Sequence, residues 1–306
     1  MRVTLPTIAL ASQLCAGEAH ACAVNGGEIW CWGLSDNGRL GVTAAERATA
    51  TPVQLPTFSS PVQSITCGAQ HTCARLDDGT VHCWGANNFR QLGVTLPAGV
   101  NSRVGAEAVP GLGAVTAIAA RLYTTCAVRI DGSVVCWGAN LAGKLGTGAG
   151  GEASATPTAV AGVTGAAGIA AGSLHFCAWG TGGVQCWGDD NEAQLGQGMA
   201  AMAPRGAVVV AGVRGPVGVA GGLGHTCVSV HSEVSHTSTS CVVSATKGTT
   251  KRRSMRSRVG ASPGAPGTRT VAMTESPTRL PPSGSRGETV MSPGIRLNTV
   301  GRGLSA

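Results

Sequence analysis

One repeated pattern constrains the fold of this chain more than any other feature. A Cys-Trp-Gly triplet occurs four times at spacings of 52, 53 and 50 residues, and a Leu-Gly pair follows each tryptophan by eight and nine positions. The tryptophans and leucines of the four copies are Trp32, Trp84, Trp137, Trp187, Leu40, Leu92, Leu145 and Leu195. A period of about fifty residues indicates stacked structural units, and we expect these eight side chains to form the repeat core.

Each unit has the character of a small β-sheet. β-branched runs such as Val62–Thr66 are separated by glycine and Asx turns, which predicts one antiparallel sheet per unit. Glycine supplies 47 of the 306 residues, whereas charged residues make up 12% and aromatic residues 3%, a composition that disfavours helical bundles and disorder. Because one sheet cannot bury both of its faces, the units must stack into an all-β propeller or solenoid.

A second cysteine precedes each triplet, in most copies after Gly-x-x-His, although the third copy has Arg121 and Thr124 at those two positions. The spacing between the paired cysteines is nine or ten residues, and it changes together with the length of the predicted turn between them. We expect hairpins near residues 20–33, 71–85, 124–138 and 175–188. Their opposed pairs are Cys22 and Cys31, Cys73 and Cys83, Cys126 and Cys136, Cys177 and Cys186.

The sequence is compatible with three states of these cysteines: disulfide-bonded, reduced or bound to a metal. Opposed residues on antiparallel strands lie about 4.5 to 5.5 Å apart at Cα, which a disulfide tolerates. Reduced cysteines are also common core residues. His20 lies on the same strand face as Cys22, so these two and Cys31 could ligate zinc, but Thr124 breaks this set in the third copy. Because the pairing survives a change of turn length, we expect disulfides that each contribute about 2 to 3 kcal/mol.

The series Gly-x-x-His-x-Cys, Asp-Gly, Cys-Trp-Gly and Gln-Leu-Gly resembles the repeat of the regulator of chromosome condensation family, especially bacterial versions rich in paired cysteines. Clear copies extend from about Cys15 to Leu223. The resemblance implies a β-propeller with blades of about fifty residues, and relatives have seven blades. Those relatives include a nucleotide-exchange factor, an ultraviolet-B receptor and a β-lactamase inhibitor protein, so the resemblance also implies recognition of a protein partner.

The array is expected to be incomplete. Four full copies precede a partial fifth near residues 225–241, where Cys241-Val242-Val243 stands in place of Cys-Trp-Gly. Val3–Pro6 matches Val53–Pro56, so the chain begins inside a repeat. We therefore expect terminal blades with exposed apolar faces and self-association through them.

The sequence divides into a propeller region, residues 1–241, and a tail, residues 242–306. The tail holds 11 Lys and Arg against 2 Asp and Glu and no aromatic residue, whereas the first region holds 11 against 13. A tail of this composition is expected to be disordered. It is either a polyanion-binding tail, the only basis for a nucleic-acid partner, or the product of a shifted reading frame. Because the repeat pattern stops inside a repeat, we favour the shifted reading frame over the polyanion-binding tail.

The sequence motifs that could indicate catalysis or ligand binding are weak. The segment 138–144 resembles a phosphate loop, but Leu145 follows where Ser or Thr would bind magnesium. Asp36, Asp189 and Asp190 fall in turns after Trp-Gly, where turn chemistry explains them. We predict no catalytic site, no cofactor and no metal, and a protein-binding module, with a guanine-nucleotide exchange regulator as the alternative. The chain shows no membrane span and no ordinary signal peptide, yet the cysteine pairs favour an extracellular or envelope location over the cytoplasm.

Overall fold

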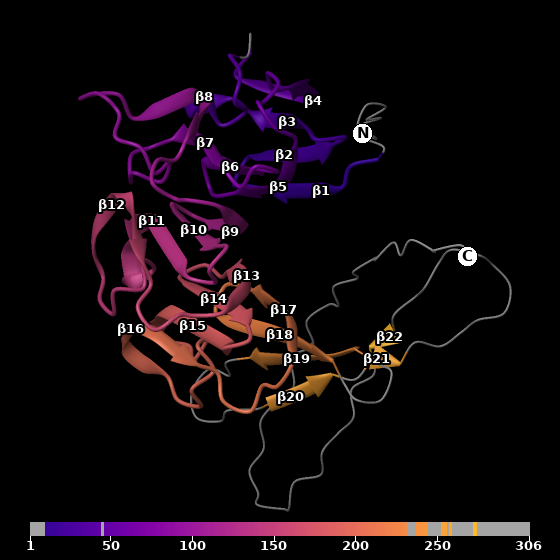
Figure 1. Cartoon of the computed structure of the whole chain (residues 1–306), viewed down its shortest axis with the longest axis vertical. Coiled ribbons are helices and arrows are strands. Elements are labelled where there is room, and N and C mark those ends of the chain that lie inside the picture. The colour runs from indigo at the N-terminus through magenta and orange to yellow at the C-terminus, as the bar shows by residue number, and fades with distance from the viewer. Residues whose placement is uncertain are drawn as a thin grey trace, which may run out of the picture.

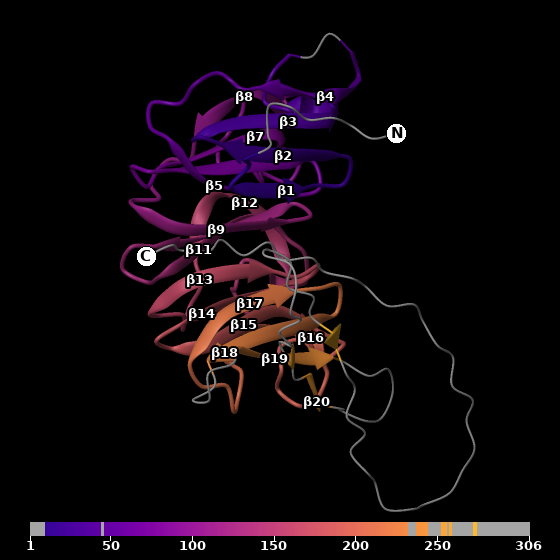
Figure 2. The same cartoon turned by 90° about the vertical axis from the view of Figure 1, so that its right-hand side faces the viewer.

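The computed structural model describes residues 10–43, 46–231, 237–243, 252–255, 257–258 and 272–273. In this part of the chain five four-stranded antiparallel sheets follow one another, and each is one blade of a propeller. The blades form an arc in Figure 1 and a stack of sheets in the side view of Figure 2. The all-β propeller fold expected from the repeat is confirmed.

Every blade is a meander of consecutive strands. The first blade contains β1 (Gln13–Ala16), β2 (His20–Asn25), β3 (Glu28–Leu34) and β4 (Ala48–Gln54). The second contains β5 (Val62–Cys67), β6 (His71–Leu76), β7 (Val81–Ala86) and β8 (Ser102–Ala108). The third contains β9 (Val115–Arg121), β10 (Thr124–Arg129), β11 (Val134–Asn140) and β12 (Gly151–Ala159). The fourth contains β13 (Ala166–Ala171), β14 (His175–Gly180), β15 (Gly183–Asp190) and β16 (Ala201–Val209).

The fifth blade extends past the end of the expected repeat region. It contains β17 (Pro216–Gly221), β18 (His225–His231), β19 (Thr237–Val243) and β20 (Arg252–Met255). A separate ladder pairs β21 (Ser257–Arg258) with β22 (Ala272–Met273), and two short 3-10 helices, η1 (Asp36–Gly38) and η2 (Leu141–Gly143), follow β3 and β11. Three strands thus lie within residues 242–306, for which the sequence predicts a disordered tail. The rest of that tail, like the Val3–Pro6 match, lies outside the described residues.

The first strands of the blades lie along the inner side of the arc, and the fourth strands lie along its outer side (Figure 1). The central hairpins of the first four blades turn where the sequence places glycine. Gly79 and Gly132 have φ of 81° and 77°, values that an L side chain rarely adopts and glycine reaches freely. In the shorter hairpins Asn25 pairs with Glu28 and Gly180 with Gly183, which leaves two-residue turns.

The cores lie between blades. Four clusters of buried apolar side chains fill the four boundaries, and each cluster draws from two successive sheets. Trp84, Trp137 and Trp187 are fully buried in them. Trp32, in the first blade, is only half-buried, because no blade precedes it within the described residues. No helix in the same part of the chain is long and apolar enough to cross a bilayer.

Candidate interaction face

The loops that join first to second strands and third to fourth strands emerge on one face of the arc, because successive strands of a meander run in opposite directions. We call this the turn face. The loops of one blade contact the turn of the next blade there: the Nδ2 of Asn37 donates to the Oε1 of Gln70 at 3.2 Å, and the Phe89 and Tyr123 rings lie 4.7 Å apart. The turn face comprises residues 17–19, 35–43, 46–47, 68–70, 87–101, 122–123, 141–150, 172–174, 191–200 and 222–224.

Buried histidines join the blades beneath this face. The Nε2 of His71 lies 2.8 Å from the Oγ1 of Thr125, which donates its own hydrogen to the carbonyl oxygen of Gln91. A hydroxyl has one hydrogen, so Nε2 must carry the ring proton and donate it. The same pairs form at two other boundaries. They are His20 with Thr72, and His175 with Thr226.

The environment of these histidines keeps them neutral. Burial, aided by Lys144, lowers the pKa of His175 to about 4, and burial, aided by Arg39, does the same for His20. Burial lowers the pKa of His71 further, to about 3. The rings of His20, His71 and His175 therefore have a structural role, because each forms a hydrogen bond between two blades.

The boundary between the third and fourth blades is built differently. Thr124 stands at the histidine position and Phe176 at the threonine position, so no His–Thr pair forms. Lys144 is buried there, with 1% of its surface exposed, and its Nζ donates to the carbonyl oxygens of Arg121 and Ser173, each at 3.0 Å. The same Nζ lies 5.4 Å from the centre of the Phe176 ring. Burial lowers the pKa of Lys144 to about 7.

The polar residues after Trp-Gly hold the loops of the turn face. The side-chain oxygens of Asn87, Asn140 and Asp190 accept the backbone N–H of the leucine in the following Leu-Gly pair, at 3.0 to 3.1 Å. Asp190 also pairs with Arg205 at 3.2 Å, and burial raises its pKa. Asp36 pairs with Arg47 at 3.0 Å. These carboxylates serve the turns, in agreement with their sequence positions.

The turn face changes character along the arc. At the first boundary it is polar, since Gln70 joins Asn37 and also donates to a carboxylate oxygen of Glu18 at 3.3 Å. Beyond it exposed apolar side chains appear. Phe89 is 38% exposed, and Leu141 in the third blade and Leu223 in the fifth blade are exposed as well.

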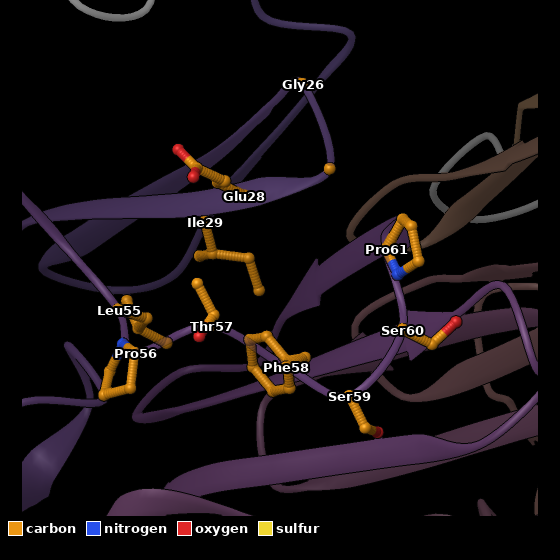
Figure 3. Close-up of a pocket in the computed structure, with 11 residues that line it drawn as sticks. Gly26, Glu28, Ile29, Leu55, Pro56, Thr57, Phe58, Ser59, Ser60 and Pro61 are labelled. Atoms are coloured by element: carbon orange, nitrogen blue, oxygen red, sulfur yellow. The ribbon is translucent and has the colours of Figure 1, made fainter.

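Two hollows lie on the surface of the described residues. One hollow of about 340 Å³ lies beside Phe89, lined by Asn87, Asn88, Arg90, residues 94–101 and Ala155. The other, of about 200 Å³, lies on the opposite face, where the linker of residues 55–61 passes the hairpin turn of the first blade (Figure 3). In that linker the Phe58 ring packs edge-on against His82 at 5.6 Å.

The predicted cysteine pairs and core residues lie beneath these surfaces. Disulfides join Cys22 to Cys31, Cys73 to Cys83, Cys126 to Cys136 and Cys177 to Cys186. Cys227 is disulfide-bonded too, and the strand register places Cys241 opposite it. The core leucines are at most 2% exposed. The tryptophan Nε1 atoms of the second, third and fourth blades donate to the carbonyl oxygens of Arg39, Gln91 and Lys144 in the preceding repeats.

One disulfide was not anticipated from the sequence. Cys15 of β1 is bonded to Cys67 of β5, so it joins the first blade to the second, across 52 residues. The same boundary position between the second and third blades holds a hydrogen bond from the Ala120 N–H to Thr66. A signal existed in the sequence, because each of these two cysteines stands just before a Gly-x-x-His segment and neither belongs to a hairpin pair.

Two overlapping segments of the chain, residues 26–75 and 62–91, match the regulator of chromosome condensation (RCC1) repeat. The chain thus contains repeats of the regulator of chromosome condensation type. It is 32% identical to protein pim1 of Schizosaccharomyces pombe over 162 residues, 47% of this chain and 30% of that protein. It is 35% identical to the ultraviolet-B receptor UVR8 of Arabidopsis thaliana over 136 residues, 44% of this chain and 30% of the receptor.

Two solved structures share the fold. Human WBSCR16 superposes with a TM-score of 0.62 at 23% identity, over 72% of this chain and 58% of that one. Prp20p of Saccharomyces cerevisiae, described with its binding to Gsp1p and histones, superposes with a TM-score of 0.60 at 22% identity, over 76% and 58%. The present chain thus spans just over half of these structures and about a third of the curated relatives.

Proposed function

We propose that this propeller is a non-catalytic protein-binding module and that its partner docks on the turn face. The observation that carries the proposal is the pair formed by Phe89 and Tyr123, whose rings contact each other across a blade boundary while Phe89 stays 38% exposed. Aromatic and arginine side chains supply much of the binding energy at protein interfaces. Arg90 and Arg121 are exposed close to the pair in sequence.

The expected partner has an apolar side chain for the exposed edge of Phe89 and carboxylates for the two arginines. Charged groups at the rim steer association, whereas the buried aromatic contact limits dissociation. The rigid boundary beneath the pair supports this arrangement, because Thr125 and Trp137 both donate to the carbonyl oxygen of Gln91. A preorganised surface of this kind loses little conformational entropy on binding.

We place this activity outside the cell or in the cell envelope. Support comes from the cysteines, none of which is free in the described part of the chain. Disulfides persist in oxidising compartments and are rare in the cytosol. The location and the binding role rest on different observations and are tested separately, the first by mapping the cysteine pairs of protein from its native compartment.

The binding test uses the oxidised full-length chain, immobilised and exposed to an extracellular and envelope fraction of its source. Replacing Phe89→Ala and Arg90→Glu together should abolish retention of the partner. The control is Ile130→Ala, which removes a 75% exposed apolar side chain from the β10–β11 hairpin on the opposite face. Undiminished retention by the double variant would overturn the assignment to the turn face.

A guanine-nucleotide exchange regulator is the second candidate. The mouse secretion-regulating guanine nucleotide exchange factor is 33% identical to this chain over 128 residues, 27% of that protein. If the retained partner is a GTPase, a nucleotide-release assay decides between the two. Accelerated release would replace simple binding with exchange.

A further inference from the structure

Five side chains able to ligate a metal gather at the boundary between the first two blades. Cys15, Cys22 and Cys31 lie on adjacent strands in direct register, and Cys67 reaches them from β5. A ring nitrogen of His20 and the sulfurs of Cys22 and Cys67 all lie within 4.8 Å of one another. His20, Cys22 and Cys67 are 4%, 0% and 6% exposed.

One ring nitrogen of His20 carries a free lone pair. The Oγ1 of Thr72 donates its hydrogen to the carbonyl oxygen of Arg39, so it accepts from the Nε2–H of His20 at 2.9 Å. A neutral ring protonated on Nε2 has its lone pair on Nδ1. That Nδ1 is buried and has no hydrogen-bond partner. A ring fixed by a hydrogen bond on one nitrogen and unpaired on the other is the usual arrangement of a metal-ligating histidine.

We propose that reduction of the disulfides Cys15–Cys67 and Cys22–Cys31 converts this boundary into a zinc site, with His20, Cys22 and Cys67 as ligands and the thiolate of Cys15 or Cys31 as the fourth. Each of these two sulfurs is bonded to a member of the cluster in the oxidised chain, so it lies beside the site. Zinc prefers four tetrahedral nitrogen and sulfur ligands, at about 2.0 to 2.3 Å. Ligand atoms within 4.8 Å of one another need only a small contraction.

The chemistry balances with a dithiol as reductant. Each disulfide accepts two electrons and two protons and yields two thiols, while one dithiol is oxidised to its cyclic disulfide. Zinc then displaces the protons of the thiols that ligate it, and these protons leave to solvent. The two states hold the same two blades together, by covalent bonds when oxidised and through the metal when reduced.

The second boundary supplies an internal comparison. His71 there repeats the geometry of His20, including an unpaired Nδ1. The positions that correspond to Cys15 and Cys67 are Thr66 and Ala120, which offer no sulfur. The proposed site is therefore specific to the first boundary, and the second provides matched control substitutions.

The test is metal titration of the full-length chain, reduced with a dithiol and freed of metal by a chelator. We expect one Co²⁺ per chain with the visible spectrum of a tetrahedral thiolate site, displaced by one Zn²⁺, and a higher thermal midpoint for the reduced protein with zinc. Cys67→Ser and His20→Ala should each weaken binding by more than about 100-fold, beyond the effect expected for loss of an outer hydrogen bond. Whichever of Cys15→Ser and Cys31→Ser also weakens binding identifies the fourth ligand.

The controls are His71→Ala and Cys136→Ser, which alter the same repeat positions at other boundaries and should leave stoichiometry and spectrum unchanged. Thr72→Val keeps all the ligands and removes only the hydrogen bond to His20, so it should weaken binding by roughly 10-fold. Absence of stoichiometric binding by the reduced chain would overturn the proposal. So would binding that is equally lost in the controls, or that persists in His20→Ala combined with Cys67→Ser.

Discussion

The Nε2 of His71 donates a hydrogen bond of 2.8 Å to the Oγ1 of Thr125, across the boundary between the second and third blades. Both side chains are fully buried. Because Thr125 passes its own hydrogen to the Gln91 carbonyl oxygen, the ring can take part only as a donor from Nε2. Among the described residues no carboxylate acts on the pKa of His71, so nothing balances a second ring proton and the bond requires a neutral imidazole.

Acid should loosen the blade boundaries. Histidine in an unfolded chain titrates near pH 6.5, whereas His20 and His175 have a pKa of about 4 and His71 of about 3 in the fold. Below pH 6.5 the unfolded chain binds protons that the folded chain does not, so stability falls as the pH falls. Each histidine contributes about 1.4 kcal/mol per pH unit in this window. Urea unfolding at several pH values measures the slope, and His71→Gln should reduce it by one histidine's share; an unaltered slope would contradict this account.

Lys144 should be needed for the boundary that lacks a His–Thr pair. Lys144→Met leaves the carbonyl oxygens of Arg121 and Ser173 buried without their donor, at roughly 1 to 3 kcal/mol each. Lys144→Gln combined with Thr124→His and Phe176→Thr should recover part of the loss, since it reinstates the bond of the other boundaries. Equilibrium unfolding compares the variants. A Lys144→Met chain as stable as the native one would show that the two bonds contribute nothing.

Lys144 should also make the stability of the protein depend on pH, but above pH 7 and not below pH 6.5. Its pKa is about 7 in the fold and near 10.5 in an unfolded chain. Between these values the unfolded chain holds the extra proton, so the stability of the native protein should rise as the pH is raised from 7 towards 10. Lys144→Met should remove this rise. Unfolding midpoints at pH 7, 8 and 9 provide the measurement, and Arg129→Met, outside this contact, is the control.

The bond between Cys15 and Cys67 should stabilise the fold more than any hairpin disulfide. It closes a loop of 52 residues, whereas the hairpin bonds of the first four blades close 9 or 10. In the chain-entropy model these lengths correspond to about 4 and about 2.6 kcal/mol. We expect Cys15→Ala with Cys67→Ala to lower the free energy of unfolding more than Cys126→Ala with Cys136→Ala does. The reverse order in denaturant titrations would refute the ranking.

Tryptophans at equivalent repeat positions should differ in importance. Trp84 is fully buried and its Nε1 donates to the Arg39 carbonyl oxygen, so Trp84→Ala should cost about 3 to 5 kcal/mol. Trp32 is half-buried, and Trp32→Ala should cost clearly less. Thermal and urea unfolding of the two variants test the difference, and equal losses would mean that another surface covers Trp32.

Contacts within a blade can be predicted from the sequence more readily than contacts between blades. The opposition of Cys73 to Cys83 follows from the length of one turn, because hairpin register is a local property. The role of Lys144 depends on carbonyl oxygens 23 and 29 residues away along the chain, in a boundary where two other repeat positions have changed. The Cys15–Cys67 bond likewise joins non-equivalent positions of two repeats, so a comparison that aligns equivalent residues passes over it.

The tryptophan and threonine bonds between blades all run from the later blade to the earlier one. The tryptophan and threonine of a later blade donate to the residue before Leu-Gly in the blade ahead of it, as Trp137 and Thr125 do to Gln91. At the second boundary the later blade thus presents tryptophan and threonine, and the earlier blade presents histidine and the residue before Leu-Gly, so the two facing sides are different and complementary. A duplication or deletion of one whole period, such as residues 62–114, keeps complementary sides opposite each other, whereas a cut of half a period removes the strands that carry one of these sides. Such an array can grow or shrink during evolution only in whole blades.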